Sequence, residues 1–319
     1  MADLSAYHSA LEGVIYYQYP IPGYLRIGGE DRLDFLQRQT TNDIRQLDSA
    51  RAMMSVLTSP AARILGVFTL LNEGDQIGVL TLPGRSDFIA DFLRKRIFFN
   101  DDVSLEDHSQ DYAQVIVEGP RSSDVLSTLG ENLPELDEVS QVDVEGVSIR
   151  IIGQPGFDGF GYRILLQNAS CEKVYSALAN AGAIQLDEDT YQVLRVEAGI
   201  PGAHGELTEE FTPLEVGLLK SAISQSKGCY TGQEVIARQI NFDKITRKLV
   251  GLRLNVPVNA GEQARANDKP AGQVTSVATS PRFGEIALAV VKRPFDQPGA
   301  EVNVGNVRAV VSEIPFSLE

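Results

Sequence analysis

The sequence Lys227-Gly228-Cys229-Tyr230-Thr231-Gly232-Gln233-Glu234 continues into Val235-Ile236-Ala237-Arg238-Gln239-Ile240 and marks the point where the chain changes its pattern. Thr231 and Glu234 have the spacing of a capping box, so we expect a helix to begin immediately after Cys229 and Tyr230. Beyond Arg247 helical periodicity disappears, and short apolar runs separated by Gly and Pro take its place. These runs predict a small C-terminal β-barrel over residues 247–319, with strands at residues 249–254, 273–277, 286–291 and 307–314.

The preceding part, residues 1–246, mixes short strands and helices, which is typical of an α+β fold. Two sets of elements of similar order follow one another, so we expect two related, intertwined α+β units. The predicted strands lie at residues 24–27, 53–57, 65–71, 77–82, 114–118, 147–152 and 162–166. The predicted helices lie at residues 31–39, 86–96, 122–129, 170–181, with Ser170 as N-cap, and 189–200.

Composition excludes several classes of protein. A chain of 319 residues with 43% apolar residues builds a sizeable core without disulfides or a structural metal. The two cysteines, Cys171 and Cys229, are far apart and form no C-x-x-C pair, which argues against a disulfide framework or a zinc site. The N-terminus has no basic and apolar signal segment, and the longest apolar run, residues 64–71, is too short to cross a bilayer. We therefore expect a cytoplasmic protein without a membrane partner.

Charge is distributed unevenly along the chain. The formal net charge of −15 disfavours nucleic acid and anionic membranes as partners of the surface as a whole. Residues 220–253, however, contain seven basic and two acidic residues. This basic stretch indicates either a local site for an anion or a solvated face with salt bridges to acidic neighbours, and charge alone does not distinguish the two.

The helix expected at residues 189–200 carries a carboxylate on its apolar side. At about 100° per residue, Val193 and Leu194 belong to one continuous apolar arc, and Glu197 falls between them while Arg195 falls outside. A carboxylate in an apolar arc needs hydrogen-bond donors. Either an internal partner, such as an arginine, or a bound ligand supplies them.

Cys229 is a candidate nucleophile or metal ligand. A thiol near a helix N-terminus, two residues from Lys227, favours its thiolate form, and Gly228 and Gly232 permit unusual backbone angles or close approach. The alternative is a small, inert cysteine that packs in the core.

The stretch at residues 227–234 resembles the signature of the YgfZ proteins, which are folate-binding relatives of the glycine-cleavage T-protein, an aminomethyltransferase. The resemblance covers nearly the whole chain. The other matching segments are Phe35-Leu36-Gln37, Thr41-Asn42-Asp43, Arg195-Val196-Glu197-Ala198-Gly199, Thr212-Pro213-Leu214-Glu215, Val274-Thr275-Ser276 and Ser280-Pro281.

The resemblance implies a cloverleaf of two ferredoxin-like α+β domains and a C-terminal β-barrel around a central channel that holds tetrahydrofolate. It also implies that Glu197 binds the pterin ring, whose adjacent N–H groups suit a buried carboxylate. The basic stretch would attract the glutamate tail of the folate. The expected folate-binding residues are Glu197, Arg195, Tyr230 and Arg247, and the expected catalytic residues are Cys229 and Lys227.

The function implied by the resemblance is folate-dependent support of iron–sulfur cluster assembly or repair, with links to tRNA modification. The expected partners are folate and client iron–sulfur proteins or assembly factors. Two alternatives stay open, an aminomethyltransferase-type one-carbon transferase and a non-catalytic folate-binding scaffold. In the T-protein an Asp-Asp pair follows a small-residue turn and contains the catalytic aspartate, whereas Ala62-Arg63-Ile64-Leu65-Gly66 occupies that stretch here. This departure argues against aminomethyl transfer of the T-protein kind.

Overall fold

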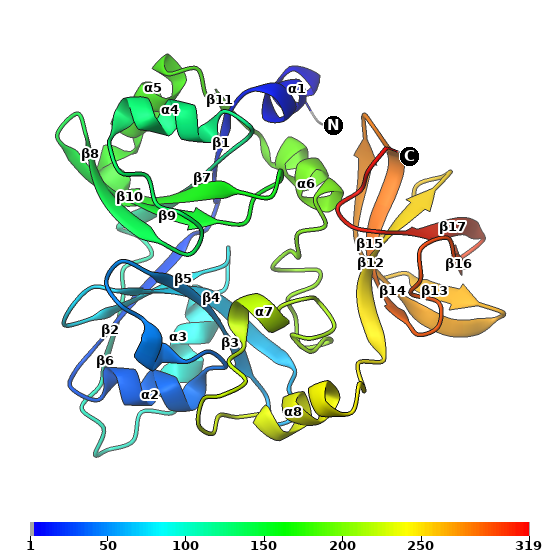
Figure 1. Ribbon diagram of the computed structural model, residues 1–319, viewed down its shortest axis with the longest axis horizontal. Helices are drawn as coiled ribbons and strands as arrows, with labels where there is room; N and C mark the ends of the chain where they lie inside the picture. Colours follow the sequence, from blue (N-terminus) through cyan, green and yellow to red (C-terminus); the bar gives the residue numbers. More distant parts are fainter. Residues whose placement is uncertain (1–2, 319) are drawn as a thin grey trace.

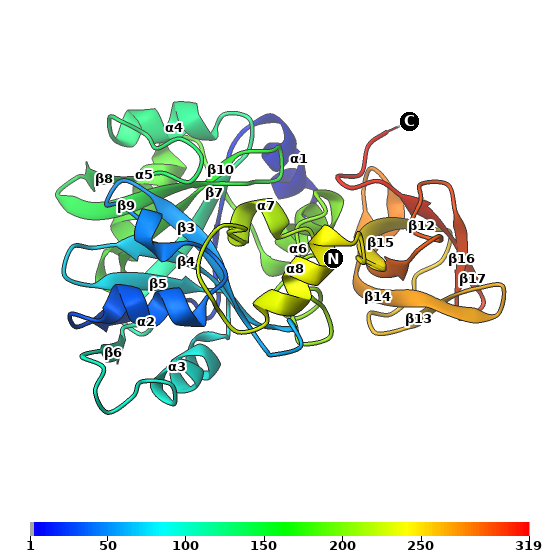
Figure 2. The same cartoon turned by 60° about the horizontal axis from the view of Figure 1, so that its bottom comes forward.

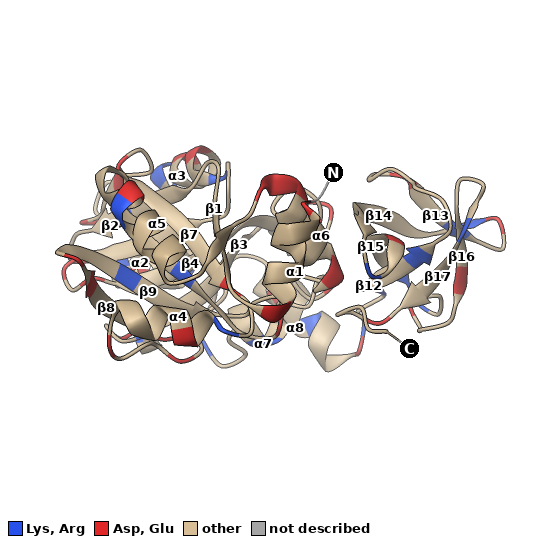
Figure 3. Ribbon diagram, turned by 90° about the horizontal axis from the view of Figure 1, so that it is seen from above, with Lys and Arg blue, Asp and Glu red and all other residues tan. Residues whose placement is uncertain are grey.

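The computed structural model describes residues 3–318, which form two β-sheet units and a closed β-barrel (Figure 1). This architecture confirms the predicted α+β class and the C-terminal barrel. Acidic and basic residues are interspersed over all three units (Figure 3). Among the helices of the described residues, none has the length and apolarity that a membrane crossing requires. Three helices lie between the sheet units and the barrel (Figures 1 and 2), namely α6 (Glu188–Glu197), α7 (Leu219–Ala222) and α8 (Gln233–Asn241).

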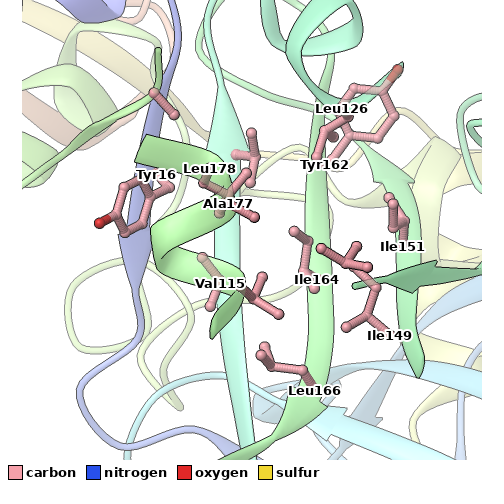
Figure 4. Packing of buried hydrophobic residues seen from close by; sticks show 14 of the residues in the cluster. Tyr16, Val115, Leu126, Ile149, Ile151, Tyr162, Ile164, Leu166, Ala177 and Leu178 are labelled. Atoms are coloured by element: carbon pink, nitrogen blue, oxygen red, sulfur yellow. The ribbon is translucent and has the colours of Figure 1, made fainter. Parts of the chain in front are cut away.

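The first unit is a six-stranded sheet, called sheet A here, with helices α4 (Ser122–Leu129) and α5 (Cys171–Asn180) packed on one face. Figure 4 shows Leu126, Ala177 and Leu178 of these helices against Val115, Ile151 and Ile164 of the strands. Ser170 occupies the predicted N-cap position of α5, but its side chain makes no capping hydrogen bond. The strand order across sheet A is β11 (Ile184–Gln185), β1 (Ile15–Gln18), β7 (Tyr112–Glu118), β10 (Gly161–Gln167), β9 (Val147–Gln154) and β8 (Val139–Val144).

The second unit, sheet B, has five strands and is covered by α2 (Arg32–Gln39) and α3 (Ser86–Arg94), with the short 3-10 helix η1 (Ile44–Gln46) after α2. Its core contains Phe35 and Leu36 of α2, both fully buried, and the partly buried Leu33 packs against it. The strand order across sheet B is β3 (Ala52–Thr58), β4 (Ile64–Asn72), β5 (Ile77–Thr81), β2 (Gly23–Gly28) and β6 (Ser104–Asp107).

The two sheets share one continuous path of the chain. Helix α1 (Leu4–Glu12) and β1 belong with sheet A, the chain then builds sheet B, and it returns to sheet A at β7. The second faces of the sheets pack together through Tyr24, Leu71 and Leu80 of sheet B and Ile152 and Leu165 of sheet A.

The barrel closes through six antiparallel strands. The four predicted strands are present, and the structure adds β13 and β16. Each of these two has only four residues and alternates exposed with buried positions, which is a weak signal in a sequence. The strand order around the barrel is β12 (Arg247–Leu254), β15 (Gly284–Lys292), β14 (Lys269–Ser280), β13 (Gln263–Ala266), β16 (Glu301–Val304) and β17 (Val307–Ser312).

Hydrophobic side chains fill the junction of sheet B, α6 and the barrel. This cluster includes Val56 and Val67 of sheet B, Val196 of α6 and Leu288 and Phe316 of the barrel unit. An open folate channel at this junction remains a prediction.

The predicted capping box at Thr231 and Glu234 is wrong. Helix α8 begins at Gln233, and its N-cap is Gly232, which has φ 85° and offers no side chain for capping. The Thr231 carbonyl instead accepts a hydrogen bond from the Thr58 hydroxyl, which ties this loop to β3. A Cβ on Gly232 would lie 2.7 Å from the carbonyl oxygen of Ser59, so the close approach of the two segments requires glycine here.

Candidate functional site

Glu197 is buried at the C-terminal end of α6, as its place in the apolar arc predicts, with only 3% of its surface exposed. Three side chains donate hydrogen bonds to its carboxylate. Tyr7 and Ser280 donate to Oε1 at 2.7 and 2.5 Å, and Arg282 Nη2 donates to Oε2 at 2.7 Å. The donors that a buried carboxylate requires are therefore present inside the protein, and they come from α1 and from the end of β14.

Among these three donors, Arg282 borders the solvent. Its side chain is 39% exposed, whereas Tyr7 and Ser280 are buried. The guanidinium lies over the ring of Phe283, 4.8 Å from its centroid, and its Nε also donates to the Tyr7 hydroxyl at 3.0 Å. Burial, together with the hydrogen bond to Glu197, raises the pKa of Tyr7 to about 12, so the phenol stays protonated and able to donate.

Arg195, expected to contact folate, is part of a separate buried cluster. It lies outside the apolar arc of α6 but is only 7% exposed. Its guanidinium donates to the Ile200 carbonyl at 2.8 Å, to Glu206 Oε2 at 3.4 Å and to the Ser276 hydroxyl at 2.9 Å. Ser276 in turn donates to Glu206 Oε1 at 2.8 Å, which joins α6 to β14 of the barrel. These contacts fix α6 on the barrel, and they use the donors of Arg195 within the protein.

Lys227 is buried, and its ammonium points toward the turn after α2. Its Nζ donates to the carbonyl oxygens of Gln37, Thr40 and Asn42 at 2.8, 2.6 and 2.7 Å. Burial lowers the pKa of Lys227 to about 8, which still leaves it protonated at neutral pH. The role that this geometry gives to Lys227 is to hold the loop before α8 against sheet B.

Cys229 is an exposed free thiol, so the core-packing alternative for this residue is wrong. Its neighbour Tyr230 is buried in a small cluster with Leu214, Ile223 and Ile236, and burial raises the pKa of Tyr230 to about 12. The ammonium of Lys227 lies 5.3 Å from the centroid of the Tyr230 ring. The loop thus anchors two side chains in the protein and presents the thiol to solvent.

Arg247, at the start of β12, forms a two-point ion pair with Glu215. Its Nε and Nη2 donate to the two carboxylate oxygens at 2.7 and 2.9 Å. The Glu215 side chain is only 4% exposed, so this pair closes the barrel against the loop that precedes α7. These contacts occupy the guanidinium that was expected to bind folate.

The structure therefore separates the predicted site residues into four groups. Lys227 and Tyr230 contact each other beside Cys229, whereas Glu197 and Arg195 belong to two clusters on α6, and Arg247 lies at the base of the barrel. The sequence prediction missed the partners of Glu197. Ser280 lies in the segment Ser280-Pro281, which matches the YgfZ proteins, but no role was assigned to it from the sequence. Tyr7 and Arg282 lie far from Glu197 in the chain, so no local sequence pattern links them to it.

No carboxylate lies along residues 62–66 at the start of β4. Ile64 and Leu65 are buried, and Arg63 Nη1 lies 3.7 Å from Glu215. The space beside Gly66 is filled, because a Cβ on this residue would lie 2.9 Å from Cγ1 of Ile89. An acidic side chain therefore has no room at Gly66 unless the Ile89 side chain moves.

Comparison with known proteins extends over both parts of the chain. Residues 10–227 match the GCVT N-terminal domain, and residues 247–317 match the glycine cleavage T-protein C-terminal barrel domain. A chloroplastic Arabidopsis thaliana protein that bears a transferase name is 30% identical over 301 residues, 92% of this chain and 69% of that protein. The aminomethyltransferase of Bacillus subtilis is 26% identical over 310 residues, 92% of this chain and 85% of that protein.

A solved structure shares the fold. The glycine cleavage system aminomethyltransferase T from Bartonella henselae superposes with a TM-score of 0.85 at 19% sequence identity, covering 98% of this chain and 89% of that one. These matches support the T-protein-like relationship, while membership of the YgfZ proteins in particular remains a prediction. The chain belongs to the family of the GCVT N-terminal domain, which is joined here to the glycine cleavage T-protein C-terminal barrel.

Proposed function

We propose that this protein binds tetrahydrofolate at Glu197 and acts as a folate-dependent one-carbon transferase. The observation that carries the proposal is a buried carboxylate whose one cationic partner, Arg282, is 39% exposed. Arg282 is the more accessible half of this pair, and a ligand that donates hydrogen bonds to the buried carboxylate would offset the loss of the guanidinium when it turns outward. The paired N–H groups of a pterin would then take its place on Oε2, and Tyr7 and Ser280 would keep Oε1 in position.

The transferase names of the relatives favour this reading over the iron–sulfur role that the YgfZ resemblance implies. They also weaken our expectation that aminomethyl transfer is absent. The feature that still opposes a fast reaction is the stretch at residues 62–66, where Ile89 fills the space beside Gly66 and no acid is present.

Calorimetry with tetrahydrofolate tests the binding site. Glu197→Gln keeps the size of the side chain but removes its charge, so we expect the affinity to fall roughly ten- to a hundredfold, the equivalent of about 1.5–3 kcal/mol. Glu301→Gln changes the same charge on an exposed barrel strand and should bind as the parent does. Equal affinity in all three proteins would show that folate does not bind at Glu197.

A turnover assay tests the reaction. With lipoyl H-protein carrying the aminomethyl group as donor, we expect measurable folate-dependent transfer at a rate below that of a T-protein by about 10²- to 10⁴-fold, the usual contribution of a general acid or base. If no transfer occurs while folate still binds, then the aminomethyl H-protein is not the donor substrate. The proposed folate site would not be affected by that result.

A second candidate function rests on Cys229. We propose that its exposed thiol supports iron–sulfur client proteins, and the linked tRNA modification, through transient iron ligation or a mixed disulfide. Cys229→Ser keeps size and hydrogen bonding but loses the soft ligand and the nucleophile. It should leave folate affinity unchanged and abolish support of a cluster-dependent enzyme in a complementation assay, with Cys171→Ser as the matched control. Full complementation by Cys229→Ser would exclude this role.

A further inference from the structure

A groove of about 450 Å³ lies where the barrel meets α8 and the start of β4, away from the contacts of Glu197. Arg63, Thr212, Gln239 and Lys292 line it, each from a different segment of the chain. A volume of this size lies within the range of about 300–1,000 Å³ that is usual for small-molecule sites.

Two of the residues that line this groove carry a buried polar atom without a partner in the described part of the chain. Within residues 3–318, the buried hydroxyl of Thr212 and the buried Oε1 of Gln239 have no hydrogen-bond partner. Thr212 is only 3% exposed, and its backbone N–H donates to Glu215 Oε2 at 2.9 Å. Its side-chain hydroxyl is therefore the group of Thr212 that lacks a hydrogen-bond partner among the described residues. Buried polar atoms are almost always paired, so a water or a ligand must supply the partners of these two atoms.

The charges of the groove favour an anion. Of its four basic side chains, Arg247 is held by Glu215 and Arg293 by Asp243, at 3.0 Å. Arg63 and Lys292 have weaker contacts. Arg63 Nη1 donates to the Glu210 carbonyl at 2.9 Å and lies 3.7 Å from Glu215, which also lines the groove. Within residues 3–318, Lys292 Nζ contacts only the Pro270 carbonyl, at 3.4 Å.

We propose that this groove is a binding site for a small hydroxylated oxyanion, a phosphate ester or a carboxylate. The anionic group lies between Arg63 and Lys292 and accepts a hydrogen bond from the Thr212 hydroxyl, while a ligand hydroxyl donates to Gln239 Oε1. The proposal is independent of the folate site, since none of these four residues contacts Glu197 in the described chain.

Calorimetry with glycerol 3-phosphate and with malate tests the site, and the comparison distinguishes a phosphate from a carboxylate ligand. Saturable binding of either compound, with no binding of glycerol, supports the proposal. Thr212→Val should weaken binding at least about tenfold, the loss expected for a hydrogen bond to a charged group. Because this hydroxyl is unpaired in the free protein, the melting temperature of Thr212→Val should stay the same or rise, which separates lost binding from lost folding.

Lys292→Met should likewise weaken binding at least about tenfold. Lys248→Met removes the same charge from an exposed position of β12 outside the groove and should bind as the parent does. The proposal is overturned if neither compound binds at millimolar concentration. It is also overturned if Thr212→Val and Lys292→Met both keep the parent affinity.

Discussion

Glu197 and Glu206 are both buried glutamates paired with arginine between α6 and the barrel, but their surroundings differ. Glu206 is fully buried, and the Arg195 side chain that pairs with it is only 9% exposed. Glu197 pairs with Arg282, which is 39% exposed. The first cluster is sealed and holds two units together, whereas the second has a partner that solvent already reaches. Under the proposed function, the difference separates a structural ion pair from one that a ligand would open.

Replacing Arg195 should have the largest effect. Arg195→Met leaves Glu206 charged and buried without its cation, so we expect the free energy of unfolding to fall by about 3–5 kcal/mol. Urea denaturation of the parent and the variant measures this difference in the free energy of unfolding. The double variant Arg195→Met, Glu206→Gln removes the uncompensated charge and should recover much of the loss. A single variant as stable as the parent would contradict the distinction between the two clusters.

A third buried glutamate extends the comparison, because Glu118 has no bonded cation. It accepts a hydrogen bond from the Phe157 N–H at 2.9 Å, and burial raises its pKa to about 8. The folded protein therefore holds a proton on Glu118 at a pH where the unfolded chain has lost it. Its contribution to stability is fully present below about pH 4.5 and is lost as the pH rises through about 8, at up to about 1.4 kcal/mol per pH unit.

The measurement is the free energy of unfolding at several pH values for the parent and for Glu118→Gln. The variant keeps a neutral side chain at every pH, so its advantage over the parent should grow between about pH 5 and 8. A constant difference between the two proteins would show that Glu118 is ionised in the folded state.

Replacing Arg282 should have the smallest effect and should act in the opposite direction on ligand binding. If the pterin replaces this guanidinium on Glu197, then Arg282→Met removes the competitor. We expect tetrahydrofolate to bind about two- to fivefold more tightly, the equivalent of up to about 1 kcal/mol for a pair whose guanidinium is 39% exposed. Calorimetry with tetrahydrofolate compares the variant with the parent. Weaker binding by the variant would mean that Arg282 contacts the ligand rather than competing with it.

The sequence predicted the elements whose burial follows a simple period. Seven strands of the two sheets and four of the barrel were predicted within a few residues, and the arc that includes Val193 and Leu194 correctly placed Glu197 inside, whereas β1, β6, β8 and β11 were not predicted. The period of a strand or a helix decides the predicted features locally, and no distant residue is needed to predict them.

The remaining features depend on contacts between distant segments. Glu197 meets Tyr7 and Arg282, which are 190 and 85 residues away in the chain, and no periodic pattern encodes such pairs. The capping box failed for a related reason, because Gly232, which lies close to the Ser59 carbonyl after β3, takes the N-cap position. Lys227 was expected to act on Cys229, but the carbonyl groups of the turn after α2 bind its ammonium instead.

The path of the chain through the two sheets determines the order in which they are completed on the ribosome. All five strands of sheet B lie between residues 23 and 107, whereas Ile15 of β1 pairs with Glu118 of β7. At a synthesis rate of about 5–20 residues per second, β1 emerges several seconds before its partner. Sheet B can therefore form as an uninterrupted insert while β1 waits with unpaired backbone groups, and sheet A is completed only after the later strands arrive.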